Sequence, residues 1–177
     1  MSCFSFLRRS DLRPSKSAIV DAFGDDEVTL AGDVNEKGGA PSQPNATTTQ
    51  LTELRAEMSK EGLDWYLVFT DDEHASEYTA ACDQQRSFIS GFTGSAGTVI
   101  VHKDTSAHAF IDGRYWIQAG EQLDHNWTLH KIGAPGVENW DEWIVKTVQQ
   151  GEKVGFDAKT ISYGEQKEMC KLRKKQS

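Results

Sequence analysis

The chain has 177 residues, of which 37% are hydrophobic and 26% charged, and its formal charge is −8 at pH 7. This acidic balance argues against a non-specific nucleic-acid binder, because neutralising phosphates requires a basic surface. No run reaches the roughly 18 apolar residues of a membrane span. Its three cysteines are far apart and form no CxxC pair, which argues against a disulfide framework or zinc knuckle and favours a reducing, cytoplasmic location.

Residues 1–46 differ in character from the rest of the chain. They hold three of the four prolines and contain no Trp or Tyr, so they cannot bury enough apolar surface to offset the entropy of ordering. We therefore predict a disordered extension. The first twenty residues carry three arginines, one lysine and a single acid, Asp11. That composition is typical of mitochondrial presequences, so mitochondrial import is the alternative location.

The ordered part is predicted to begin with a helix and a buried strand. Thr47 and Gln50 form a capping-box pattern, apolar residues follow at helical spacing as far as Met58, and Gly62 ends the segment. Residues 65–69 are continuously apolar, which is typical of a central strand covered on both faces.

The remaining segments continue this alternation of strand and helix. Apolar runs at 98–102 and 107–111, separated by a short polar turn, fit a β-hairpin. The further expected elements are a helix at 115–123, a strand at 127–132, a helix at 140–148, a strand at 153–156 and a helix at 163–175. The pattern predicts one α/β domain with a mixed central sheet flanked by helices, in which the three apolar runs are the innermost strands.

The glycine-rich stretch at 91–98, GFTGSAGT, invites comparison with a phosphate-binding loop. It lacks the Gly-Lys-Ser/Thr ending, and its spacing matches no dinucleotide fingerprint. It also leads into a predicted strand, so no helix N-terminus would face an anion. We interpret it as a tight loop in which glycines allow positive φ and close backbone packing.

His74 and Glu77 are three residues apart, a spacing that can place two metal ligands on one helical face. A metal site needs three or four converging ligands, and a residual hypothesis, an enzyme in its own right, would add Asp83 as the third ligand. No GxSxG motif is present, and no motif surrounds Cys82. We therefore predict neither a metal site nor a catalytic residue in this chain.

Residues 112–115, Asp-Gly-Arg-Tyr, are the most distinctive feature. They follow a predicted buried strand and precede a helix, where α/β proteins display functional side chains. Arg114 carries a guanidinium fork that suits a carboxylate or carbonyl ligand. The alternative is a structural arginine paired with Asp112 or Asp83, and spacing alone leaves both interpretations open.

Several motifs occur together in a fixed order. They are SEY at 76–78, an arginine at 86, SGFTGSAGT at 90–98, DGRY at 112–115 and NWTL at 126–129. Over about 49–175 this order closely resembles the N-terminal domain of eukaryotic aminopeptidase P, the Xaa-Pro aminopeptidases of the creatinase/prolidase superfamily. One departure is that Gln85 stands where the family usually has the first of two arginines.

The resemblance implies a creatinase N-terminal-like fold for 47–177, truncated at its C-terminal end and without the pita-bread catalytic domain. In the family that domain holds two divalent metals, typically manganese, so this chain is expected to hold no cofactor and to be inactive alone. The resemblance also implies that Arg114 contacts peptides with proline in the second position. The implied function is the non-catalytic part of a Xaa-Pro aminopeptidase that gates and orients substrate. The alternative is a stand-alone interaction module that forms homo-oligomers or pairs with full-length subunits.

Overall fold

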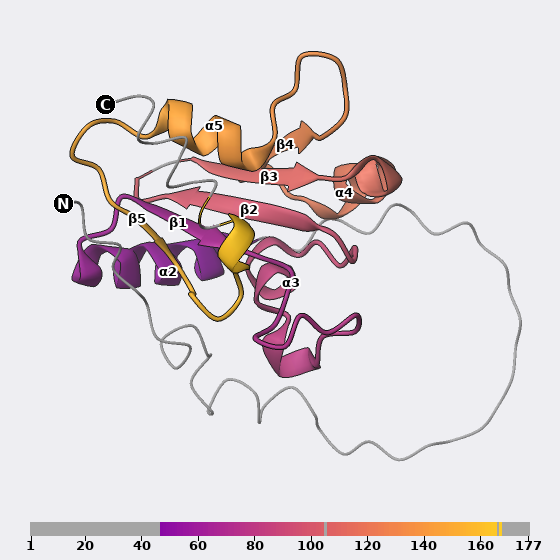
Figure 1. Cartoon of the computed structure of the whole chain (residues 1–177), viewed down its shortest axis with the longest axis horizontal. Coiled ribbons are helices and arrows are strands. Elements are labelled where there is room, and N and C mark those ends of the chain that lie inside the picture. Colours follow the sequence, from indigo (N-terminus) through magenta and orange to yellow (C-terminus); the bar gives the residue numbers. More distant parts are fainter. Residues whose placement is uncertain (1–46, 105, 166, 168–177) are drawn as a thin grey trace, which may run out of the picture.

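The computed structural model describes residues 47–104, 106–165 and 167. The predicted disordered extension and presequence at 1–46 lie outside the described residues, as does most of the helix predicted at 163–175. Residues 163–165 and 167 of that segment are helical. The described part is a five-stranded mixed sheet with helices on both faces, which confirms the α/β prediction (Figure 1).

The strand order in the sheet is β4-β3-β2-β1-β5. The central strands β1 (Trp65–Val68), β2 (Gly97–His102) and β3 (Ala107–Ile111) form an antiparallel meander. Strand β5 (Val154–Phe156) joins β1 in parallel, and β4 (Thr128–Lys131) joins β3 in parallel. The three apolar runs are therefore the innermost strands, as predicted.

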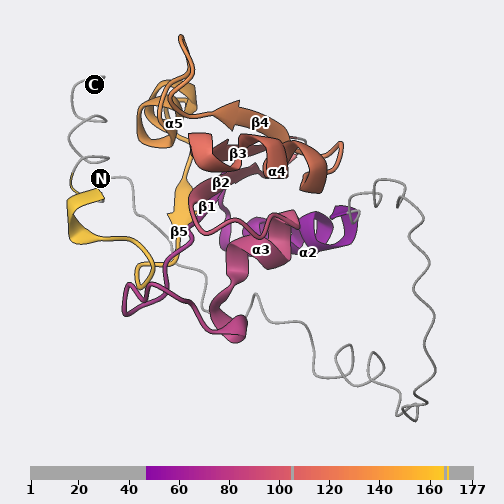
Figure 2. The ribbon, with the colours of Figure 1, turned by 90° about the vertical axis from the view of Figure 1, so that its right-hand side faces the viewer.

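Helices cover the two faces of the sheet unequally. The core beneath one face includes residues of α2 (Thr48–Glu61), α3 (Gln85–Ser90) and α4 (Trp116–Gln122). On the opposite face, α5 (Trp140–Thr147) packs over a second cluster (Figure 2). The sequence predicts helices at the positions of α2, α4 and α5, but it does not predict α3, which is only six residues long. Helix α2 ends at Gly62, whose φ of 63° is left-handed.

Strand β1 contributes to both core layers because its successive side chains point to opposite faces. Tyr66 and Val68 pack with the α2 side, whereas Trp65 and Leu67 pack with the α5 side. All four residues of β1 are buried, which confirms the prediction of a strand covered on both faces.

The capping box predicted at the start of α2 is wrong. The Thr47 side chain makes no capping hydrogen bond to the helix. Its Oγ1 instead donates to Asp124 Oδ2 at 3.0 Å and accepts from Trp127 Nε1 at 2.8 Å. Gln50 Oε1 is buried without a hydrogen-bond partner among the described residues. Thr47 therefore ties the helix to the segment before β4, a long-range contact that local spacing cannot reveal.

We expect Asp124→Asn to lower the free energy of unfolding by about 1 kcal/mol, because an amide keeps a single acceptor oxygen for this network. Burial opposes ionisation of Asp124, but hydrogen bonds from Thr47 and Asn126 outweigh it and lower the pKa of the carboxyl. Urea unfolding of the variant and of Glu121→Gln, an exposed site on α4, checks the expectation. Equal changes in the two variants would contradict it.

Candidate functional site

One edge of the sheet gathers three loops. Because β2 runs antiparallel to both β1 and β3, the ends of β1 and β3 lie beside the start of β2. Thr70 Oγ1 donates to the carbonyl of Gly97 at 2.6 Å, and Ser95 Oγ lies 2.6 Å from the Tyr115 hydroxyl in a second hydrogen bond. The segments that meet at this edge are 70–79, 92–96 and 112–115.

The Asp112–Tyr115 segment forms a short turn at the end of β3, with the 3-10 helix η3 at Gly113–Tyr115. The Asp112 carboxylate accepts from the backbone N–H of Arg114 at 3.0 Å and from its Nε at 2.7 Å. These contacts hold the arginine at the carboxyl end of a rigid strand. The structural pairing with Asp112 is therefore present, and it fixes Arg114 on the surface.

Both partners of this ion pair are exposed. The hydrogen bonds from Arg114 lower the pKa of Asp112, and the carboxylate in turn raises the pKa of Arg114. The guanidinium also lies 5.4 Å from the centroid of the Tyr115 ring. Its Nη1 and Nη2 form no hydrogen bond within the described part of the chain. These two nitrogens can therefore donate hydrogen bonds to a carbonyl or carboxylate of a ligand.

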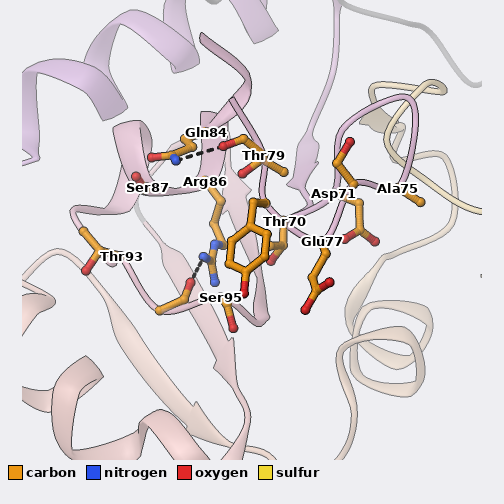
Figure 3. Close-up of a pocket in the computed structure, with 13 residues that line it drawn as sticks. Thr70, Asp71, Ala75, Glu77, Thr79, Gln84, Arg86, Ser87, Thr93 and Ser95 are labelled. Atoms are coloured by element: carbon orange, nitrogen blue, oxygen red, sulfur yellow. Dashed lines mark hydrogen bonds between the residues drawn. The ribbon is translucent and has the colours of Figure 1, made fainter. Parts of the chain in front are cut away.

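A pocket of about 380 Å³ opens at the same edge of the sheet. Its walls come from the segment after β1, the start of α3 and the loop before β2 (Figure 3). Most of the lining side chains carry hydroxyl or amide groups, and its charged residues are Asp71, Glu77 and Arg86. The pocket is small enough to suit a compact polar ligand.

Arg86 is the buried charge of this pocket, at 5% exposed. Its Nη2 donates to the carbonyl of Gly94, and its guanidinium lies 4.8 Å from the centroid of the Phe92 ring. Nε and Nη1 have no hydrogen-bond partner among the described residues. Burial lowers the pKa of Arg86 to about 10, against the opposing effects of Tyr115 and Asp71. In the sequence, Arg86 is recognisable only as part of a motif. The spacing of the residues around it does not reveal that its side chain is buried.

The glycine-rich loop is structural, as predicted. Gly91 ends α3 with a φ of 72°. At Gly97, φ is 155°, and a Cβ would lie 2.7 Å from Ile111 Cδ1 and 3.1 Å from the carbonyl of Phe110. The loop then enters β2 rather than a helix. These features explain the glycines by close packing, with no need for a phosphate ligand.

His74 and Glu77 do not lie on one face of a helix, because residues 71–80 form turns, bends and irregular backbone rather than a helix. His74 is exposed, with its Nε2 3.5 Å from Glu73 Oε1. Asp83 lies in the 3-10 helix η2 (Ala81–Asp83), beside the exposed Cys82. Among the described residues, no group of three or more His, Cys, Asp or Glu side chains is placed to hold a metal ion.

No helix within 47–104 and 106–165 is both long and apolar enough to cross a bilayer.

Several curated relatives are similar to this chain over its ordered part. A probable Xaa-Pro aminopeptidase P from Chaetomium globosum is 51% identical over 118 residues, which cover 66% of this chain and 19% of the relative. Its counterpart from Coprinopsis cinerea is 48% identical over 116 residues, covering 66% of this chain and 18% of the relative. The chain therefore spans about a fifth of the length of these relatives.

Solved structures and a family model agree with this similarity. An X-prolyl aminopeptidase from Caenorhabditis elegans, described as a cytosolic enzyme with a di-nuclear active site, superposes with a TM-score of 0.68 at 33% identity, covering 74% of this chain and 23% of that one. The N-terminal domain of a metallopeptidase from Corynebacterium diphtheriae superposes with a TM-score of 0.53 at 25% identity, covering 71% and 87%. The model of the creatinase/prolidase N-terminal domain matches residues 50–175. The chain therefore belongs to the creatinase/prolidase N-terminal domain family.

Proposed function

We propose that this domain is the non-catalytic part of a Xaa-Pro aminopeptidase and that it orients the peptide substrate through Arg114. The names of the similar proteins support the enzyme class. The observation that carries the role of this domain is the placement of Arg114. It is an exposed guanidinium, anchored by Asp112 at the carboxyl end of β3, with two nitrogens that bind nothing in the described structure.

The chemistry available to Arg114 is recognition. Its side chain donates through Nε to Asp112, which leaves the outer nitrogens to donate to a peptide carbonyl or carboxylate. Anchoring limits the rotamers of the arginine before the peptide arrives, so less entropy is lost on binding. A peptide held in one orientation reacts faster because its positional entropy is lost on binding and not in the reaction step.

The described residues do not fit a di-nuclear metal centre, since they bring together no set of three or more potential ligands. We therefore assign them no hydrolytic step. In our proposal, the metal ions and the cleavage of peptides with proline in the second position belong to a part of the enzyme other than these residues, and the role of Arg114 depends on that part being present.

Arg114→Ala in a Xaa-Pro aminopeptidase that carries this domain is expected to lower kcat/KM by about 5- to 30-fold, which corresponds to about 1–2 kcal/mol. The loss is modest because the arginine is exposed and water screens its contacts. Metal content should not change. The measurement is steady-state cleavage of a Xaa-Pro peptide, with bound metal determined on the same samples.

Lys103→Ala provides the matched control. Lys103 Nζ donates to Asp64 Oδ1 at 2.7 Å in an exposed ion pair like that of Arg114, but it follows the end of β2, at the opposite edge of the sheet. This variant should keep full activity. An equal loss in both variants, or no loss in Arg114→Ala, would rule out a specific orienting role.

A further inference from the structure

We infer that the pocket beside Arg86 binds the zwitterion of a free α-amino acid, with the carboxylate on Arg86 and the ammonium group toward Asp71. This site is separate from the proposed role of Arg114, which is not among the residues that line the pocket. The inference follows from a buried guanidinium with two unpartnered nitrogens, from the opposite charges across the pocket, and from the size of the pocket.

The guanidinium of Arg86 has two hydrogen-bond donors that lack an acceptor among the described residues. Nε and Nη1 are buried and unpartnered within the described residues, and the one hydrogen bond of the group runs from Nη2 to Gly94. Buried donors without acceptors are rare in folded proteins because each is costly. Arg86 forms part of the pocket wall. Its unpartnered nitrogens are closed to solvent, so in our proposal the side chain turns slightly toward a bound ligand to donate to it. A carboxylate, which carries a negative charge and two acceptor oxygens, is the best match for a guanidinium with unpartnered donors.

Acidic groups stand across the pocket from Arg86. Figure 3 shows the carboxylates of Asp71 and Glu77 on one side and the guanidinium of Arg86 on the other. The structure contains no ion pair between Arg86 and a described carboxylate, although Asp71 and Arg86 are close enough for each to shift the pKa of the other. These acids repel a dianion such as phosphate. They favour a ligand that carries a positive group at the end opposite its carboxylate.

The size of the pocket limits the ligand further. Its volume of about 380 Å³ is near the lower end of the range for small-molecule sites. A long peptide does not fit within it, whereas one amino acid does. Hydroxyl groups of Ser76, Thr93 and Ser95 also line the wall and offer polar contacts to the main-chain atoms of such a ligand.

The test compares four probes by calorimetric titration into the full chain. L-leucine carries both charges, 4-methylpentanoate only the carboxylate, L-leucinamide only the ammonium group, and inorganic phosphate is an anion without an ammonium group. We expect L-leucine to bind at least about tenfold more tightly than each of the others, since each lacks one charged contact. Equal binding of 4-methylpentanoate, or tighter binding of phosphate, would overturn the assignment of a zwitterion.

Variants then locate the site. Arg86→Gln should weaken L-leucine binding by about tenfold or more, and Asp71→Asn should abolish the preference for L-leucine over 4-methylpentanoate. The matched control is Arg55→Gln. Arg55 is another partly buried arginine, but its Nε and Nη2 already donate to the carbonyls of His102 and Ser106. Binding that survives Arg86→Gln, or that falls equally in Arg55→Gln, would overturn the inference.

A measurement on the unmodified chain covers the case in which Arg86→Gln does not fold. The Nε–H resonance of Arg86 in a nitrogen–proton NMR spectrum should shift on saturation with L-leucine, while that of Arg55 should stay in place. No shift of the Arg86 resonance at saturation would overturn the inference. Either result leaves the role of Arg114 in peptide cleavage to its own test.

Discussion

Phe110→Ala is expected to lower the free energy of unfolding by about 3–5 kcal/mol, the usual cost of truncating a fully buried phenylalanine. Phe110 is 0% exposed and lies on β3, one of the three innermost strands. Its ring stacks on His130 at a centroid distance of 4.3 Å and lies 5.3 Å from the ring of Trp143. Alanine would leave a cavity between the sheet and α5 that these rings cannot fill without moving.

Urea unfolding, followed by circular dichroism, measures this loss. Ile117→Ala is the control, because Ile117 is 82% exposed on α4 and should contribute little to stability. A loss below about 1 kcal/mol for Phe110→Ala, or an equal loss for both variants, would mean that the layer under α5 is not part of the stable core.

The sequence predicts the central strands well because their signal is local. The run at 65–69 has no polar position, so it can only be buried on both faces, and β1 is buried on both faces in the structure. Strands β2 and β3 are also mostly buried, and their largely apolar runs lie on either side of a short polar turn. The hairpin predicts that β2 and β3 are neighbours, whereas the pairing of β2 rather than β3 with β1 comes from the structure.

Predictions fail where a side chain has a distant partner. Thr47 has the spacing of a helix cap, but its hydroxyl bonds Asp124 and Trp127, which are 77 and 80 positions away in the chain. A free-energy difference of about 1 kcal/mol between two hydrogen-bond partners is enough to decide such a case. The spacing within the first helical turn contains no information on that competition.

In the candidate site, too, the features set by local sequence were predictable and those set by long-range contacts were not. The position of Arg114 was predictable, because the end of a buried strand in an α/β domain is where side chains meet ligands. The pocket beside Arg86 was not predictable, because it forms only when the loops after β1 and before β2 meet at one edge of the sheet. Arginine side chains are also mostly exposed in folded proteins, so the residue type alone predicts an exposed position for Arg86 rather than a buried one.

We expect a pair of histidines on the α5 side to make the stability of the domain sensitive to acid. His108 Nδ1 and His130 Nε2 are 3.0 Å apart, on the adjacent strands β3 and β4. Both rings are half-buried and lie within 5.5 Å of the Trp143 ring, measured between centroids. Burial, with smaller contributions from His130 and His102, lowers the pKa of His108 from 6.5 to about 4, and burial also lowers the pKa of His130.

These shifts set the direction and the range of the pH effect. A histidine whose pKa is lower in the folded state binds its proton more readily when unfolded, so acid favours unfolding. The contribution of His108 is fully present above pH 6.5 and is lost as the pH falls toward about 4. Full burial would make this loss about 3 kcal/mol. Because the ring is partly exposed, screening by water reduces our expectation to about 2 kcal/mol, and His130 acts in the same direction.

Carboxyl groups also titrate near the lower end of this range, so the test compares variants at each pH. The difference in unfolding free energy between pH 7.5 and pH 4.5 should be smaller in His108→Gln than in the unmodified chain by about 2 kcal/mol, because glutamine takes up no proton. His125→Gln, which replaces an exposed histidine in the loop before β4, should leave the difference unchanged. If His108→Gln retains the full pH dependence, the half-buried pair is not the source of the acid sensitivity, and ordinary protonation of carboxylates that are hydrogen-bonded in the fold, such as Asp124, accounts for it.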